Sequence, residues 1–245
     1  MELRGQIKRV QSLSGKLCNF GGKGDHYTTK YQSALIPTVM TTVAKSVQYI
    51  NYDGLYTITD YILFDGNSYI DTKFKPTNNT KIVVKCKFNV VNKYLFGSRT
   101  SATSDDAHAF LPAQKSTYAQ FGSNQKAAAS VTQAGEIITV TQSQSGTYVN
   151  DSLVKSYADM NFTSAYDLFV GACNNGGTAD SRMLVGDIYS FGIYENGTEI
   201  KHLLPCVRDS DNKLGMIDII GGTFYTATVA ETNTTNDIVS EEATI

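Results

Sequence analysis

The stretch Leu184–Cys206, LVGDIYSFGIYENGTEIKHLLPC, predicts two β-strands joined by a tight turn. Its first part, Asp187–Tyr194, is rich in aromatic and β-branched residues, which favour strands. This part is apolar on both sides, so we expect it to lie in the centre of a sheet. Strict alternation of side chains would place Tyr189, Phe191 and Ile193 on one face, and Ile188 and Tyr194 on the other.

The return half of this hairpin is more polar. Asn196-Gly197 tolerates positive φ at both central positions and therefore predicts a type I′ turn. Glu199–Leu204 then runs back, and Pro205 is expected to end the strand because proline donates no ladder hydrogen bond. Because this strand carries charges, we expect it nearer an edge of the sheet. The segment indicates a fold and not a catalytic centre.

The composition indicates a β-rich chain with a buried core and argues against two kinds of partner. Hydrophobic residues make up 41% of the 245 residues, enough for a core, whereas charged residues make up only 18%. The net charge of −2 provides no general attraction to nucleic acid. No apolar run approaches the ~18 residues that span a membrane. We therefore expect neither a nucleic-acid partner nor membrane insertion.

The cysteines and the two ends of the chain give weaker signals. Cys18, Cys86, Cys173 and Cys206 form no C-x-x-C motif, and MELRGQIKRVQ lacks the apolar core of a signal peptide. We therefore expect reduced thiols and no cofactor. Residues 229–245 hold four acids and no base, which is typical either of a docking segment or of a solvated tail.

From residue 61 onward, strand and turn signals alternate about every ten residues. The expected strands are Tyr61–Phe64, Tyr69–Thr72, Lys81–Phe88, Tyr94–Ser98, Ala109–Leu111, Tyr118–Phe121, Glu136–Thr141, Gly146–Val149 and Leu168–Ala172. We expect no amphipathic helix of normal length in this part. The spacing predicts an all-β fold, an antiparallel β-sandwich.

The order of these pieces resembles the concanavalin A-like (laminin-G-like) jelly roll over residues 59–228. The resemblance rests on five segments: Phe64–Thr72, Phe96–Arg99, Leu168–Asn174, Gly186–Tyr194 and Leu204–Cys206. The variant with GMID at 215–218 and GTFY at 222–225 looks like those of phages and bacteria from gut communities. The resemblance implies a jelly-roll β-sandwich, followed by an acidic C-terminal tail at 229–245. A fold of this kind does not assign a function.

The N-terminal part resembles other proteins. The pattern L-x-G-x-I-x-x-V-x-S-L-S-G-x-L at 3–17 looks like the opening of virion proteins from tailed bacteriophages. Pro37–Met40 and Tyr52–Thr59 are similar to a small β repeat of phage fibre and tail proteins. The resemblance implies an attachment arm at 1–28 and a small β-rich linker at 29–58, which together anchor the jelly roll.

What this second resemblance implies is a structural role in a virion, as a head fibre, decoration or tail-associated protein assembled in the bacterial host cytoplasm. Residues 1–58 would contact other virion proteins. Because residues 1–28 have too few large apolar groups for a core of their own, we also expect a homo-oligomer, and symmetric virion parts are often trimers. The alternatives are a carbohydrate-binding adhesin of a gut bacterium and a glycoside hydrolase.

No catalytic residue is expected. Glycoside hydrolysis needs two carboxylates ~5–9 Å apart, and the glucanase pattern E-x-D-x-x-E is absent. Asp209 and Asp211 are two residues apart, but Asp209–Asn212 is typical of a polar turn. His108 is expected in a loop beside Asp105 and Asp106. A histidine in such a loop is more often solvated than bound to a metal. We therefore expect no metal site.

Glycan binding remains as a hypothesis for the loops. Sugars stack on exposed aromatic rings and pair their hydroxyls with Asn, Asp and Arg. There is no Trp, but Tyr94, Tyr118 and Phe121 are expected near the concave sheet. The candidate ligand-binding residues are Arg99, Asp106, Tyr118, Asn174, Asn175, Asp180 and Arg182.

Overall fold

The computed structural model describes residues 55–113, 117–123, 130–131 and 133–229. The predicted arm 1–28, most of the predicted linker 29–58 and nearly all of the acidic tail lie outside these residues. The described residues form seventeen strands and no helix, so the prediction of an all-β fold is confirmed. None of their elements is a helix long and apolar enough to cross a membrane.

In chain order the strands are β1 (Tyr56–Ile58), β2 (Ile62–Asp65), β3 (Ser68–Asp71), β4 (Thr80–Phe88), β5 (Phe96–Arg99), β6 (Ala107–Leu111), β7 (Tyr118–Gly122), β8 (Ile138–Ser143), β9 (Gly146–Val149), β10 (Ser152–Lys155), β11 (Phe169–Val170), β12 (Asn174–Asn175), β13 (Thr178–Ala179), β14 (Val185–Glu195), β15 (Thr198–Arg208), β16 (Lys213–Asp218) and β17 (Phe224–Val229).

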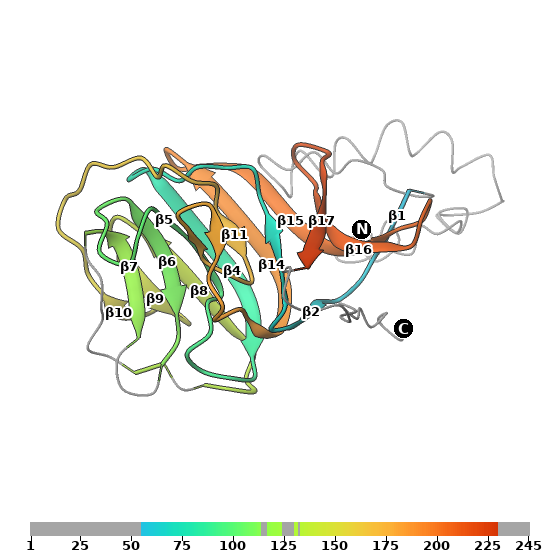
Figure 1. Ribbon diagram of the computed structural model, residues 1–245, viewed down its shortest axis with the longest axis horizontal. Coiled ribbons are helices and arrows are strands. Elements are labelled where there is room, and N and C mark those ends of the chain that lie inside the picture. Colours follow the sequence, from blue (N-terminus) through green and yellow to red (C-terminus); the bar gives the residue numbers. More distant parts are fainter. Residues whose placement is uncertain (1–54, 114–116, 124–129, 132, 230–245) are drawn as a thin grey trace, which may run out of the picture. The chain divides into compact units, whose positions relative to one another are not determined.

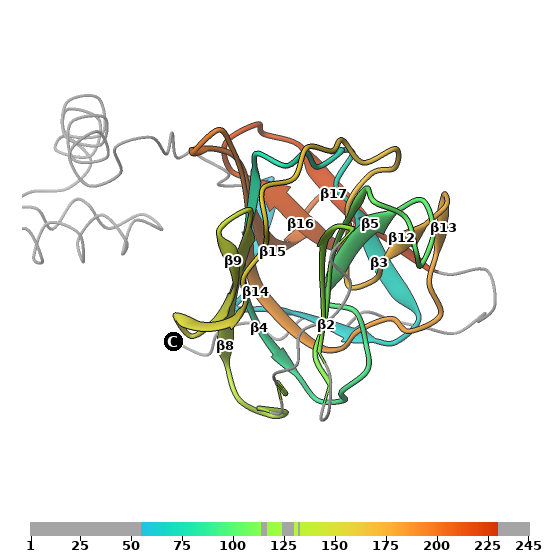
Figure 2. The same ribbon diagram turned by 90° about the vertical axis from the view of Figure 1, so that its left-hand side faces the viewer.

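The strands form two layers, sheet A and sheet B (Figures 1 and 2). Sheet A runs β10-β9-β8-β4-β14, and both β2 and β15 pair with the other edge of β14 before β16 follows. Sheet B runs β3-β11-β5-β6-β7. The first half of β17 pairs with β16 and its second half with β3, so this strand joins the two sheets. Pairing between these strands is antiparallel except between β5 and the short β12, and a parallel bridge outside them joins Tyr94 to Met183.

The core lies between the sheets because every second side chain of the long strands is apolar. In β4 the even-numbered residues from Ile82 to Phe88 are fully buried, whereas the lysines between them reach the outer face. Phe96 of sheet B packs edge-on against Phe191 of sheet A at 5.8 Å between ring centroids. The contact shows which face of each sheet points inward.

The predicted hairpin forms, and β14 has two register shifts, one against β15 between Ile193 and Tyr194 and one against β4. Asn196 and Gly197 have φ of 51° and 80°, as the predicted type I′ turn requires, and β14 is central. A bulge between Ile188 and Ser190 shifts the alternation. Ile188 therefore faces the core together with Phe191, and the prediction that Tyr189 shares the face of Phe191 is wrong.

The second strand of the hairpin also differs from expectation in two ways. β15 is not near an edge, because it pairs with β14 and β1 on one side and with β16 on the other. Pro205 does not end it. The amide of Thr59 donates to the Pro205 carbonyl at 3.0 Å, and proline cannot donate in return. The proline thus ends the pairing of β1, but it does not end β15. The last paired residue of β1 is Ile58.

β1 belongs to sheet A although its residues lie in the predicted linker 29–58. Tyr56 pairs with Arg208 and Ile58 with Cys206. The aromatic ring of Tyr56 stacks on that of Phe224 at 5.4 Å between ring centroids. This contact attaches β1 to β17, the strand that joins the two sheets.

Candidate functional site

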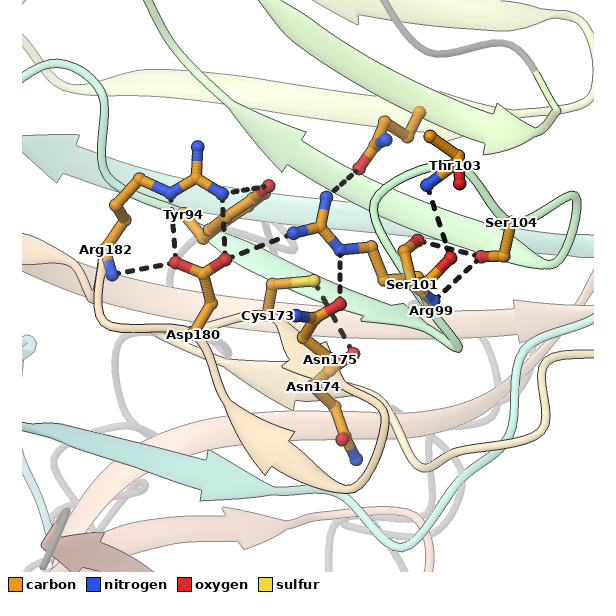
Figure 3. A network of polar contacts seen from close by, with 11 residues as sticks. Tyr94, Arg99, Ser101, Thr103, Ser104, Cys173, Asn174, Asn175, Asp180 and Arg182 are labelled. Carbon is orange, nitrogen blue, oxygen red and sulfur yellow. Dashed lines mark hydrogen bonds and ion pairs between the residues drawn. The ribbon is translucent and has the colours of Figure 1, made fainter.

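Four of the seven predicted ligand-binding residues meet on the outer face of sheet B, the face turned away from the core. Arg99 ends β5, Asn175 lies on β12, and Asp180 and Arg182 follow β13. The β12–β13 hairpin folds onto the end of β5 because Asn175 pairs with Arg99. Figure 3 shows Asp180 between the guanidinium groups of Arg99 and Arg182. We call this group, with Tyr94, the arginine cluster.

Arg99 is a buried member of the cluster, with 2% of its surface exposed. Its Nε donates to Asn175 Oδ1 at 3.1 Å, one Nη to Gln120 Oε1 at 3.0 Å and the other to Asp180 Oδ2 at 3.1 Å. All three guanidinium nitrogens are therefore occupied within the protein. This side chain positions the hairpin and is not available to a ligand.

Arg182 is the exposed member, with 41% of its side chain accessible. Its Nε and Nη2 donate to the two oxygens of Asp180 at 2.9 and 2.8 Å, a bidentate pair. The same Nη2 donates to the hydroxyl of Tyr94 at 3.2 Å, and the guanidinium carbon lies 4.9 Å from the centre of that ring. Among the described residues Nη1 has no partner, and Figure 3 shows it directed away from Asp180. The exposed fork is thus held rigidly in place.

The electrostatics of the cluster follow from one carboxylate between two cations. Burial alone would raise the pKa of Asp180, but hydrogen bonds from Arg182 and the charges of both arginines outweigh it and lower the pKa. Burial raises the pKa of the Tyr94 phenol to about 12, and burial also raises that of the neighbouring Cys173 thiol to about 12. The tyrosine and the cysteine are therefore neutral at physiological pH, and the cluster carries one net positive charge.

The structure places the other three predicted residues apart from this cluster or gives them local roles. The Asn174 side chain donates to the Asp167 carbonyl and accepts from the Gly177 amide, which stabilises the hairpin turn. Asp106 accepts from the amide and hydroxyl of Thr100 at 2.9 and 2.6 Å, which shapes the loop after β5. Tyr118 lies half-buried on β7, on the same outer face as the cluster.

Two members of the site were not predicted in the role that they have. Gln120 is two residues from Tyr118 on β7, so alternation alone would have placed both on the outer face. Tyr94 was expected to stack on sugars, but it is fully buried beneath the arginines. Phe121 is fully buried, with its ring against His108 on the core side, so it is not exposed for stacking on a sugar.

The remaining titratable candidates have structural roles. His108 is not in a loop: it lies on β6 and is fully buried. Within the described ranges, no three His, Cys, Asp or Glu side chains come together to hold a metal ion. Asp105, Asp106 and Asp159 do line a surface hollow of about 420 Å³.

The pair of acids weighed for glycoside hydrolysis lies in a turn. Asp209 accepts from the Thr57 hydroxyl at 2.8 Å, and Asp211 forms a bidentate pair with Arg208 at 2.8 and 2.6 Å. Both belong to the β15–β16 hairpin, where Asn212 has φ of 52°. The prediction of a polar turn at this position is confirmed.

Comparisons with known proteins add little to this description. No family model matches the chain, and no curated protein matches its sequence. Among solved structures, a mutant of the NanB sialidase from Streptococcus pneumoniae is similar at a TM-score of 0.36 and 15% identity. The match covers 57% of this chain and 27% of the sialidase chain, so the chain spans about a quarter of that protein's length. We assign no activity or substrate from it.

Proposed function

We propose that this chain is a non-enzymatic virion protein whose β-sandwich is displayed for glycan adhesion. The adhesion site would be the rim of the arginine cluster, by which we mean its exposed side around Arg182. The observation that supports adhesion is the rigid, exposed fork of Arg182 on the outer face of sheet B. The support for a virion role is the resemblance of residues 3–17, 37–40 and 52–59 to segments of phage proteins. The two halves of the proposal rest on different parts of the chain and are tested separately.

The chemistry of the rim suits glycans. Two guanidinium groups and one carboxylate leave one positive charge, and Arg182 Nη1 offers two N–H donors to a sugar hydroxyl or carboxylate. Because Asp180 and Tyr94 already hold Arg182, little side-chain freedom is lost when a ligand binds. Tyr118 adds a half-buried ring on the same face.

The adhesion half is tested by screening the full chain on a glycan array and measuring the affinity of the best binder for Arg182→Ala. We expect a loss of about tenfold or more, since a charge-assisted hydrogen bond contributes about 1.5–3 kcal/mol. Arg208→Ala is the matched control, because Arg208 forms an equivalent bidentate pair with Asp211 on a different hairpin. Equal losses for both variants, or no binder on the array, would contradict adhesion at this rim.

The virion half is tested by mass spectrometry of phage particles purified from the bacterial host in which this chain is expressed. We expect the protein in the particle, and we expect a chain lacking residues 1–54 to be absent from it. The deletion stops before Leu55 so that β1 keeps its pairing with β15. Glycan binding by a protein that is missing from particles would instead favour the bacterial adhesin.

A further inference from the structure

The imidazole of His108 is buried on the inner face of sheet B without a hydrogen bond. It packs edge-on against Phe121 at 5.1 Å and against Phe96 at 6.2 Å between ring centroids. Neither Nδ1 nor Nε2 has a partner among the described residues. Burying a polar group in this way is unfavourable, and burying its charged form is far more so. The site therefore accommodates neutral histidine only.

An irregular segment covers the edge of the sandwich next to His108. We call Ser156–Thr163, which follows β10 and leads toward β11 (Figure 1), the strap. Its Tyr157 ring stacks on Phe121 at 5.0 Å, and its Phe162 ring meets Phe121 edge-on at 5.0 Å. Phe121 is thus packed between the histidine on one side and the strap on the other.

The strap also joins the two sheets. The Tyr157 hydroxyl accepts from Gln142 Nε2 of β8 at 2.9 Å and lies 2.6 Å from the Thr147 hydroxyl of β9. On the side of sheet B, Met160 packs so closely over Gly122 of β7 that a Cβ there would clash with the sulfur. Release of the strap would therefore expose Phe121, the ring that lies between the strap and His108.

The attachment of the strap is sparse in backbone hydrogen bonds. The described backbone bonds are one near its C-terminal end, from the Asn78 amide to the Phe162 carbonyl at 3.0 Å, and one just beyond it, from the Ser164 amide to the Pro76 carbonyl at 2.8 Å. An exposed segment with few such bonds opens at a lower free energy than the central strands of a sheet. We therefore expect the strap to open before the central strands of the described part.

In the part of the chain that the structure describes, few ionisable groups lie around His108. Tyr157 is the ionisable group of the strap that points inward, and its pKa is raised to about 12 by burial, so it stays neutral. Asp159 is exposed, and Asp105 and Asp106 precede β6 in a loop. Asp106 is held ionised by its hydrogen bonds, which lower its pKa. Arg99 of β5 points to the opposite face of the sheet.

We propose that the strap is an acid-released cover, which leaves β7 when His108 takes up a proton while the rest of the sandwich stays folded. On its other sides the imidazole of His108 is enclosed by β5, by β7 and by the core around Phe96, so water cannot reach it there. On the strap side, His108 is separated from solvent by the ring of Phe121 and by the strap rings of Tyr157 and Phe162 that pack on it.

The sign of the pH dependence follows from linkage. Burial lowers the pKa of His108 to about 3, whereas a hydrated imidazole has a pKa of about 6.5. The covered state is fully favoured above pH 6.5 and loses its advantage as the pH falls toward 3. In this window the open state binds one more proton, so the opening constant rises about tenfold per pH unit.

Hydrogen exchange on the full chain between pH 7 and pH 4.5 measures this opening directly. After correction for the intrinsic exchange rate, we expect the protection of the Asn78 and Ser164 amides to fall about tenfold per pH unit below 6.5. The amides of central β4, such as that of Val84, should keep their protection. A uniform loss over both sets would indicate global unfolding and overturn the proposal.

Substitution of the histidine separates this effect from other acid-sensitive groups. His108→Leu should abolish the pH dependence at Asn78 and Ser164, and His108→Gln should do the same if the leucine variant does not fold. His202→Gln is the matched control, because His202 is half-buried on β15 and bonded to Glu199. Pronounced pH dependence that persists without His108, or that disappears without His202, would overturn the proposal.

Discussion

At the scale of single residues, Asp180 is the group that holds the arginine cluster together. It accepts from Arg99 at 3.1 Å and from Arg182 at 2.9 and 2.8 Å, and it lies within one hairpin turn of Asn175. Arg99 has 2% of its surface exposed, so the loss of the carboxylate would leave a buried cation without its charged partner. Removing one partner of a buried ion pair lowers the free energy of unfolding by far more than the intact pair contributes to it.

Asp180→Asn should lower the free energy of unfolding by about 3 kcal/mol at pH 7, since breaking a buried pair costs about 3–5 kcal/mol. The pKa of Asp180 is lowered in the folded state, so its contribution is present above the unfolded pKa of about 3.9 and is lost as the pH falls through the lowered value. The difference from the parent should therefore shrink at pH 2. Urea denaturation at the two pH values measures it.

Asp211→Asn is the control for this prediction. Asp211 pairs with Arg208 in the same bidentate manner, but the pair is exposed to solvent at the β15–β16 turn. Exposed pairs contribute little because water and salt screen them. A loss of stability as large as that of Asp180→Asn would show that burial does not set the energetics of the cluster.

At the scale of elements, the bulge in β14 decides which side chains stabilise the central hairpin. It places Ile188 in the core with Phe191 and Ile193 and turns Tyr189 outward, where Tyr189 and Tyr194 lie under the lysines of β4. Lys81 Nζ is 3.9 Å from the centre of the Tyr194 ring and Lys85 Nζ is 5.6 Å from that of Tyr189. A regular strand would have buried Tyr189 instead.

Phe191→Ala should therefore cost about 4 kcal/mol of stability, as expected for a fully buried aromatic ring. Tyr189→Ala should cost less than about 1 kcal/mol, because the ring is on the outer face and only partly buried. Thermal and urea unfolding of the two variants provide the comparison. Similar costs for both would mean that the alternation continues through the position of the bulge.

At the scale of the whole molecule, the sandwich is closed by contacts between distant parts of the chain. β1 pairs with β15, and β17 pairs with β16 in one sheet and with β3 in the other. The buried Tyr225 of β17 belongs to the same core cluster as Ile70 of β3 and Met216 of β16. Loss of this one strand would expose apolar surface in both sheets.

A chain that ends at Gly222 should fail to unfold cooperatively, because it lacks β17. A chain that ends at Val229 keeps every described strand and should unfold with the stability of the full chain to within about 1 kcal/mol. Circular dichroism and urea denaturation distinguish the two. A stable, cooperative fold without β17 would contradict its closing role.

Part of the candidate site could be read from the sequence. The segments 98–108 and 174–182, which are rich in Arg, Asp and Asn, contain the four of the seven predicted residues that meet in the structure. Their meeting could not be derived, because Arg99 contacts Asn175 and Asp180 across 76 and 81 residues of chain. Those contacts decide which polar groups form hydrogen bonds with one another. Groups bonded in this way are not available to a ligand.

The sequence by itself determined the all-β class, most strand positions and the type I′ turn at Asn196-Gly197, because alternation and turn chemistry act between neighbouring residues. Only the tertiary structure decided the bulge in β14, the interior position of β15 and the burial of His108. These features depend on which strands lie on either side, and the choice of partners is made by packing across the whole core. A local pattern contains no information about them.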